Sequence, residues 1–138
     1  MEPSISLRKA TAQDIHLELL RRTQRNDLNG ERVVASLLKH RDLWLAALLD
    51  MPGVPDYTEP GLLLTSGLIK LRDLPRNLWN ADQLFIMTRT HEDARQLARI
   101  AEEEDWFGDV HLYEDQKEID HALGTGRRGY GLLSVWWD

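Results

Sequence analysis

The sequence predicts a domain of the α/β class, or of the related α+β class, with helices at its start and a β-sheet in its second half. Apolar residues recur at helical spacing before residue 50, and three short apolar or alternating segments after residue 80 are typical of strands. Helical patterns separate these three segments, and strands joined by helices usually run parallel. We therefore expect N-terminal helices followed by a β-α-β-α-β unit with a mainly parallel sheet.

The first helix is expected to begin after Thr11. Thr11 and Asp14 have the spacing of a capping box and precede the apolar residue Ile15. We expect this helix to end between Asn26 and Gly30.

A second and stronger helix is expected over residues 31–50, because its apolar residues keep returning to one helical face. The stripe has no apolar residue in the turn near Arg41 and Asp42, so the alternative to one continuous helix is a break at these residues. The stripe consists of Val34, Leu37, Leu38, Leu45, Leu48 and Leu49.

Prolines and glycines at residues 51–55 and 59–61 predict an exposed connection after this helix. The short apolar runs at residues 62–64 and 68–71 fit either a strand or a helix, and we interpret them as strands.

The second half has the clearer pattern. Its first strand is an almost continuous apolar run, as expected when both faces are covered, and its last strand is apolar on both faces, which favours a central position. In chain order we expect a strand at Gln83–Thr88, a helix with Thr90 as N-cap, a strand from Val110 to Tyr113, a helix from Glu118 to Leu123 and a strand from Tyr130 to Trp137.

Composition is typical of a single globular domain spanning residues 1–138, because 42% of the residues are hydrophobic and 29% are charged. The chain has no cysteine, which excludes a disulfide framework, a thiolate zinc site and a cysteine nucleophile. No apolar run is long enough for a signal sequence or a membrane span. We expect a cytoplasmic protein with no membrane partner.

Negative charge is concentrated at the end of the chain. Residues 101–138 hold ten of the 23 acidic residues and three of the 17 basic residues. Binding to nucleic acid needs the opposite charge, because neutralised phosphates supply most of the non-specific affinity. The sequence therefore predicts that nucleic acid is not a partner.

An acidic stretch from Glu102 to Asp120 contains one basic residue, Lys117, and includes the aromatic residues Trp106 and Phe107. Its first carboxylates follow a helix C-terminus, where the helix dipole disfavours negative charge. One interpretation is a solvated face that keeps the protein in solution. The other is a docking surface for a basic protein, with an aromatic anchor. The predicted partner-binding residues are Glu102, Glu103, Glu104, Asp105, Trp106, Asp109, Glu114, Asp115, Glu118 and Asp120.

A ligand pocket is the alternative site, since α/β domains usually bind small molecules at the C-terminal ends of parallel strands. In that case a small enzyme or ligand-binding domain would use the residues that follow the predicted strands. These residues are Thr88, Arg89, Thr90, Glu114 and Asp115.

Other motifs carry little chemical signal. The glycine-rich turn from Gly124 to Gly131 leads from a helix into a strand, which is the wrong polarity for a phosphate-binding loop. Among the histidines, His111 and His121 could meet Asp109 in space, but no tight metal-ligand spacing occurs. We therefore expect no metal, no cofactor and no catalytic residue.

These observations favour a non-enzymatic, acidic protein-binding module. A concrete version is a toxin-neutralising or immunity protein, or an inhibitor, that covers the positively charged active site of a nuclease or another phosphate-handling enzyme. A purely structural role as a subunit or accessory protein is a further alternative.

Overall fold

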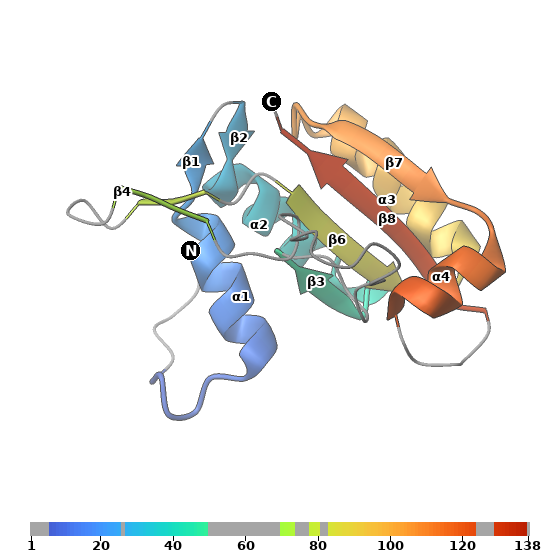
Figure 1. Cartoon of the computed structure of the whole chain (residues 1–138), viewed down its shortest axis with the longest axis horizontal. Helices are drawn as coiled ribbons and strands as arrows, with labels where there is room; N and C mark the ends of the chain where they lie inside the picture. The colour runs from blue at the N-terminus through green and yellow to red at the C-terminus, as the bar shows by residue number, and fades with distance from the viewer. Residues whose placement is uncertain are drawn as a thin grey trace, which may run out of the picture.

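The computed structural model describes residues 6–25, 27–49, 70–73, 78–80, 83–123 and 129–137. Figure 1 shows how their helices and strands are arranged. In chain order these are α1 (Ala12–Arg21), β1 (Gln24–Arg25), β2 (Leu28–Asn29), α2 (Gly30–Lys39), the 3-10 turn η1 (Arg41–Leu43), β3 (Ala46–Leu48), β4 (Lys70–Asp73), β5 (Leu78–Asn80), β6 (Gln83–Thr88), α3 (His91–Glu103), β7 (Asp109–Tyr113), α4 (Gln116–Leu123) and β8 (Gly131–Trp136).

A four-stranded sheet with the order β3-β6-β8-β7 forms the centre of the fold, and every neighbouring pair is antiparallel. Ser134 of β8 pairs with Phe85 of β6 on one side and with His111 of β7 on the other. Strands β6 and β7 therefore run in the same direction with β8 between them. The short hairpins β1-β2 and β4-β5 form two further antiparallel sheets.

The class is α+β, and the expected mainly parallel sheet is wrong. The connection β6-α3-β7 does join two strands of the same direction, but these strands are not neighbours because β8 lies between them. Strand β7 ends at Tyr113, which pairs with Leu132 near the start of β8. The chain thus re-enters the sheet at the end where it left. A parallel neighbour would need a crossover along the whole sheet, and α4 has only eight residues.

The capping box at the start of α1 is confirmed. The backbone N–H of Asp14 donates to Thr11 Oγ1 at 3.0 Å, and the backbone N–H of Thr11 donates to Asp14 Oδ2 at 2.9 Å. The helix ends at Arg21, earlier than expected, and the hairpin β1-β2 follows.

The expected helix over residues 31–50 is correct only as far as Lys39. The chain turns at Arg41–Leu43, where the apolar stripe skips a turn, and then forms β3. The Trp44 side chain is fully buried, and its indole Nε1 donates to the Leu37 carbonyl at 2.8 Å. This contact folds the chain back onto α2, so the helix cannot continue.

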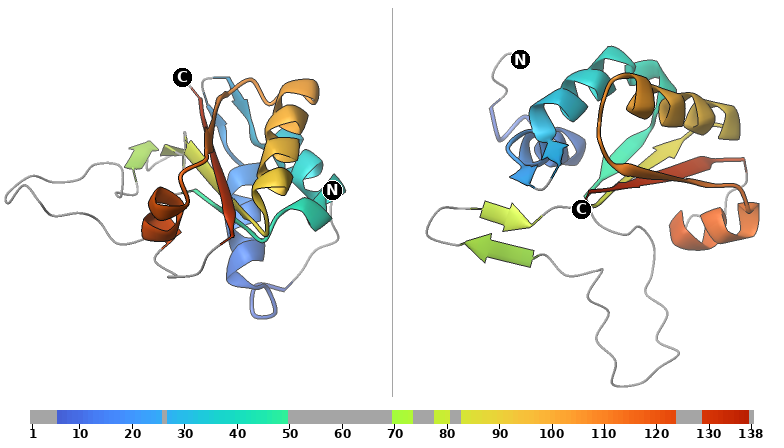
Figure 2. Two further views of the ribbon diagram at one scale, coloured as in Figure 1. Left: turned by 90° about the vertical axis from the view of Figure 1, so that its right-hand side faces the viewer. Right: turned by 90° about the horizontal axis from the view of Figure 1, so that it is seen from above.

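Helices α2 and α3 lie over one face of the sheet, and α4 lies over part of the other face, as Figure 2 shows. On one face, Leu84, Ile86, Leu133 and Val135 belong to the main core with the buried residues of α2 and α3. On the other face, Ile119 of α4 joins Phe85 and Leu132 in a smaller cluster. The expected strands at β6, β7 and β8 and the central position of β8 are confirmed.

The expected connection at residues 51–61 and the strand at residues 62–64 lie outside the described residues. The strand expected at residues 68–71 overlaps β4, which pairs with β5. None of the described helices has the length and apolar character that a membrane crossing needs.

Close packing of α1 against α2 depends on Gly30. A Cβ atom at this position would lie 1.8 Å from the Leu20 carbonyl oxygen and 2.6 Å from that of Thr23. Because both atoms belong to the backbone, no side-chain rotation relieves the clash. We expect Gly30→Ala to lower the free energy of unfolding by about 1–3 kcal/mol, although alanine normally stabilises a helix relative to glycine. Urea denaturation measures this change, and an equal or higher stability would contradict the packing.

Candidate functional site

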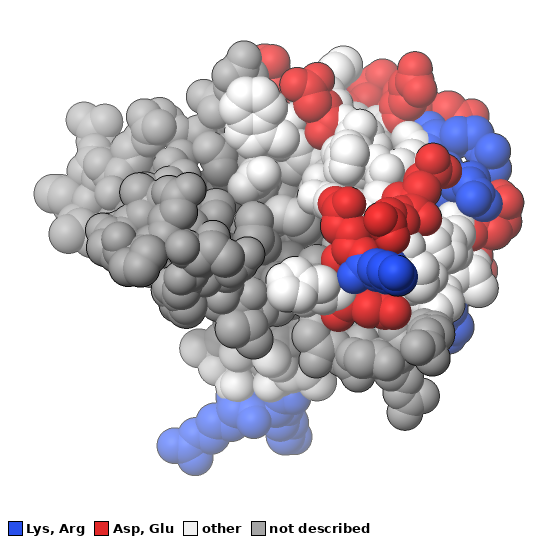
Figure 3. All heavy atoms as spheres, turned by 45° about the vertical axis from the view of Figure 1, so that its right-hand side comes forward, with Lys and Arg blue, Asp and Glu red and all other residues white. Residues whose placement is uncertain are grey.

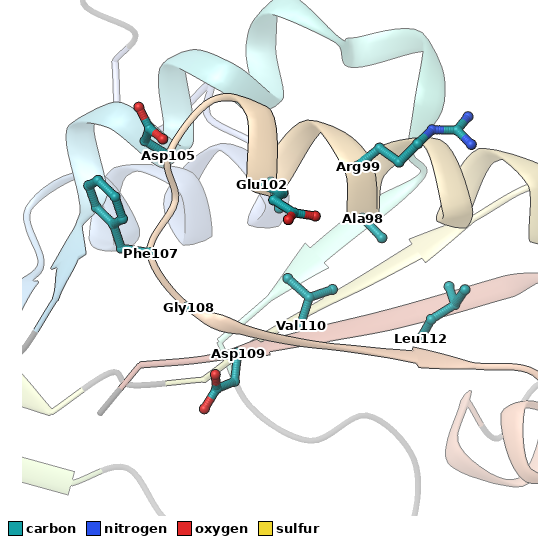
Figure 4. A pocket seen from close by; sticks show the side chains of 10 residues that line it. Ala98, Arg99, Glu102, Asp105, Phe107, Gly108, Asp109, Val110 and Leu112 are labelled. Atoms are coloured by element: carbon teal, nitrogen blue, oxygen red, sulfur yellow. The ribbon is translucent and has the colours of Figure 1, made fainter.

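A groove of about 560 Å³ runs between α3 and the edge strand β7. Figure 4 shows its side chains. Its apolar lining includes Ala98 of α3 and Val110 and Leu112 of β7. The other lining residues are Arg99, Ala101, Glu102, Asp105, Phe107, Gly108 and Asp109.

The groove exists because a strand with alternating side chains lies beside a helix with small ones. Val110 pairs with Val135 and Leu112 pairs with Leu133, so both belong to the face that α3 covers. Ala98 and Ala101 of α3 are too short to reach the outer part of this face. Val110 consequently remains 37% exposed.

The loop from α3 to β7 has an unusual backbone. Asp105 and Phe107 both have positive φ angles, of 57° and 58°. Left-handed backbone is tolerated by aspartate but is rare for a bulky aromatic residue. Between them, Trp106 is buried, and its carbonyl accepts a 2.6 Å hydrogen bond from Trp137 Nε1. The loop is therefore fixed to the end of β8.

Gly108 permits the close approach of this loop to the sheet. A Cβ atom here would lie 2.4 Å from Val135 Cγ1 and 2.9 Å from the indole of Trp137. The backbone thus packs directly on β8, while the Phe107 side chain remains 61% exposed at one end of the groove.

Arg32 of α2 supports the exposed Phe107 side chain. Its guanidinium carbon lies 5.6 Å from the centre of the Phe107 ring, a cation–π distance. Its Nη1 also donates to the Asp105 carbonyl at 3.4 Å. The ring is therefore exposed to solvent and contacts the Arg32 side chain on one side.

Three carboxylates border the groove: Glu102, Asp105 and Asp109. All three are exposed, and none forms an ion pair with a described residue. In Figure 4 Glu102 lies above Val110, and Asp109 points away from α3. Figure 3 shows acidic side chains over the side of the molecule that carries β7 and α4, with basic side chains among them.

Two of the predicted partner-binding residues, Trp106 and Glu104, make contacts within the fold. Trp106 is only 1% exposed, so it belongs to the core and Phe107 is the aromatic residue that this loop exposes. Glu104 lies at the end of α3 and contacts three groups of α2 and its C-cap: Ser36 Oγ at 2.7 Å, His40 Nε2 at 2.8 Å and Lys39 Nζ at 3.4 Å.

The remaining predicted residues lie outside the groove. Glu103 is exposed at the last position of α3. At the far end of β7, Glu114 lies 3.9 Å from Arg95, and Asp115 Oδ1 accepts from the Lys117 N–H at 2.9 Å. On α4, Asp120 accepts from Gln116 and Glu118 is exposed.

The alternative ligand pocket was expected at the C-terminal ends of parallel strands, but neighbouring strands of this sheet are antiparallel. Strands β6 and β7 run in the same direction and finish at the same end of the sheet. This end therefore holds Thr88 to Thr90 and Glu114 to Asp115. However, Thr88 is fully buried, and its hydroxyl donates to the Thr90 carbonyl at 2.7 Å. Thr90 itself caps α3 by accepting from the Asp93 N–H. These residues fill the end of the sheet and start the helix.

The histidines form no metal site in the described part of the chain, where no group of three metal-binding side chains occurs. The His111 ring instead contacts Tyr113 edge to face, with 4.4 Å between the ring centres. Within the glycine-rich turn, residues 124–128 lie outside the described residues.

Comparison with known proteins gives no relative: no family model, no curated protein and no solved structure matches the chain.

The contacts of Glu104 predict a pH-dependent stability. Hydrogen bonds with His40 and then Ser36 are the main causes that lower the pKa of Glu104 from 4.5 to about 2. A lowered carboxylate pKa stabilises the fold above the unfolded-state value, and this contribution is lost as the pH falls from about 4.5 towards 2. We expect Glu104→Gln to cost about 1–2 kcal/mol at pH 7 and close to nothing near pH 2.

Urea denaturation of both proteins across this pH range measures the difference. Glu18, whose pKa is also lowered to about 2 mainly by Arg21, is present in both proteins and cancels in the comparison. A difference that stays constant with pH would show that the charge of Glu104 is not the cause.

Because the backbone at Phe107 is left-handed, we expect that phenylalanine is not the residue that gives the highest free energy of unfolding at this position. Phe107→Gly relieves the unfavourable φ angle, whereas Phe107→Ala retains it. Both substitutions remove the contact with Arg32. We therefore expect the glycine variant to be more stable than the alanine variant by about 1 kcal/mol. Thermal and urea unfolding measure the pair, and equal stabilities would argue against strain at this position.

Proposed function

We propose that this protein is a non-enzymatic, protein-binding domain that receives a basic partner in the groove between α3 and β7. One observation carries the proposal: apolar floor, unpaired carboxylates and an exposed aromatic ring lie together at one place. The floor includes Ala98, Val110 and Leu112, and the carboxylates are Glu102, Asp105 and Asp109.

Each part has a distinct role in binding. An aromatic side chain such as Phe107 buries a large apolar area on contact and loses little side-chain entropy, particularly when it is already held by Arg32. The carboxylates attract a positively charged surface over a distance and increase the association rate. The apolar floor supplies area that can be desolvated at the centre of the contact.

Folding alone gives a poor explanation for this arrangement. The last turn of α3 contains no basic residue, although the helix dipole favours one there. Phe107 has a backbone angle that is unfavourable for its side chain. Unfavourable local choices that gather at one surface are typical of functional sites.

A cytoplasmic toxin-neutralising or immunity protein, or another inhibitor of a basic enzyme, fits such a surface. The active site of a nucleic-acid- or phosphate-handling enzyme is positively charged, and an acidic groove with an aromatic anchor could cover it.

The test combines capture of partners from the native cell with kinetics on the purified pair. In a biosensor measurement, we expect the double variant Glu102→Lys, Asp109→Lys to associate at least about tenfold more slowly than the unmodified protein. We also expect this difference to shrink as salt is raised, because screening weakens steering. Phe107→Ala should act mainly on the dissociation rate.

A matched control changes the net charge equally without altering a residue that lines the groove. Asp27→Lys, Asp42→Lys alters two exposed carboxylates in the β1-β2 turn and in η1. It should reduce the association rate much less than the groove variant. Equal association rates of the two double variants would show that the groove is not the binding site. If neither double variant changes the association rate, the acidic surface does not contribute to binding and the proposed function is wrong.

A further inference from the structure

Strand β7 has an open edge. It pairs with β8 along one side, and no described residue forms a backbone hydrogen bond to its other side. Its first three residues are exposed, and its register with β8 runs without a shift from Asp109 to Tyr113. The strand is therefore regular, and it is exposed from Asp109 to His111, whereas Leu112 and Tyr113 are partly buried.

The opposite edge of the same sheet is closed. Strand β3 has only three residues, and the Gln13 side chain of α1 satisfies both backbone groups of Ala47. Gln13 Nε2 donates to the Ala47 carbonyl at 2.9 Å, and the Ala47 N–H donates to Gln13 Oε1 at 2.8 Å. One amide side chain thus takes the place of a neighbouring strand.

Proteins normally protect an open edge with lysine, proline, a bulge or a covering segment. Strand β7 contains no lysine or proline, and its pairing with β8 has no bulge. Gln13 covers the short edge, whereas no segment among the described residues pairs with the longer edge beside the groove. The contrast indicates that the open edge is retained for use.

We infer that β7 accepts an extended, basic segment of the partner as a fifth strand of the sheet. This inference rests on the proposed function and specifies its binding mode. Backbone hydrogen bonds to β7 would supply affinity, and alternate side chains would supply specificity. One set would lie in the groove beside Ala98 and Val110, below Glu102, and lysine or arginine residues of the other set would meet Asp109 on the opposite face.

Charge argues for a basic segment over a second copy of this chain. In antiparallel pairing of two β7 strands centred on His111, Asp109 of each copy would lie beside Tyr113 and Glu114 of the other. Asp109 would face Tyr113 directly, and Glu114 would lie one position further along, so negative charges would approach each other at both ends of the contact, which is unfavourable. A basic strand faces no such repulsion.

The experiment uses the full chain, labelled with ¹⁵N, and a seven-residue synthetic peptide of alternating valine and lysine. Two further peptides carry N-methyl groups on either the valine or the lysine amides. Successive amides of a strand point to opposite sides, so one set of amides pairs with the host strand. Methylation of that set removes hydrogen bonds without changing the charge of the peptide.

We expect the unmodified peptide to slow the hydrogen exchange of β7 amides. We also expect at least one methylated peptide to bind about tenfold more weakly, since two or more hydrogen bonds are lost. Glu102→Lys should lower the affinity of the protein for the unmodified peptide, whereas Asp42→Lys should lower this affinity less.

Three results would overturn strand addition. The first is binding of both methylated peptides with the affinity of the unmodified one, and the second is no binding of the unmodified peptide at millimolar concentration. The third is a dimer of the protein alone in which the β7 amides are already protected. If the peptide binds through Glu102 regardless of methylation, strand addition fails and the acidic docking groove stands. The capture and charge-reversal experiment decides the proposed function separately.

Discussion

The hydrogen bond from Trp137 Nε1 to the Trp106 carbonyl fixes the geometry on which the groove depends. It attaches the loop after α3 to the end of β8, with both indoles buried and with Gly108 allowing direct contact with the sheet. This attachment holds the end of the loop against β8, immediately before β7 begins. It also forces the residue between Trp106 and Gly108 outward, which explains why Phe107 is exposed in a left-handed conformation.

The acidic residues near this loop divide into groups with different physical roles. Glu104 links the end of α3 to α2 through Ser36 and His40, so it contributes to stability. Glu102, Asp105 and Asp109 have no ionic partner among the described residues and remain available to a ligand. A stretch of like charges in a sequence is therefore not one surface, because burial and partners differ from one residue to the next.

Sequence patterns predicted the local structure of the second half well, since strong amphipathic and capping signals agree there. Thr90 and Thr11 cap helices as their spacing indicates. The relative direction of the strands could not be predicted from the sequence, because a strand that is apolar on both faces can be central in a parallel or in an antiparallel sheet. Nothing in the composition of residues 113–131 shows that the chain returns at the same end. Residues 44–48 fit a helical stripe, but the burial of Trp44 against Leu37 overrides that local preference.

The candidate site was predictable only in part. The acidic stretch pointed to the correct region, and the alternation of Val110 and Leu112 indicated which face they share. No sequence signal shows that Trp106 is buried and Phe107 exposed, because the choice depends on the backbone angles of the loop. Hydrogen-exchange mass spectrometry of the complex with a captured basic partner tests the central claim most directly. We expect slower exchange within residues 98–113, whereas slower exchange confined to α1 and α2 would place the partner elsewhere on the protein.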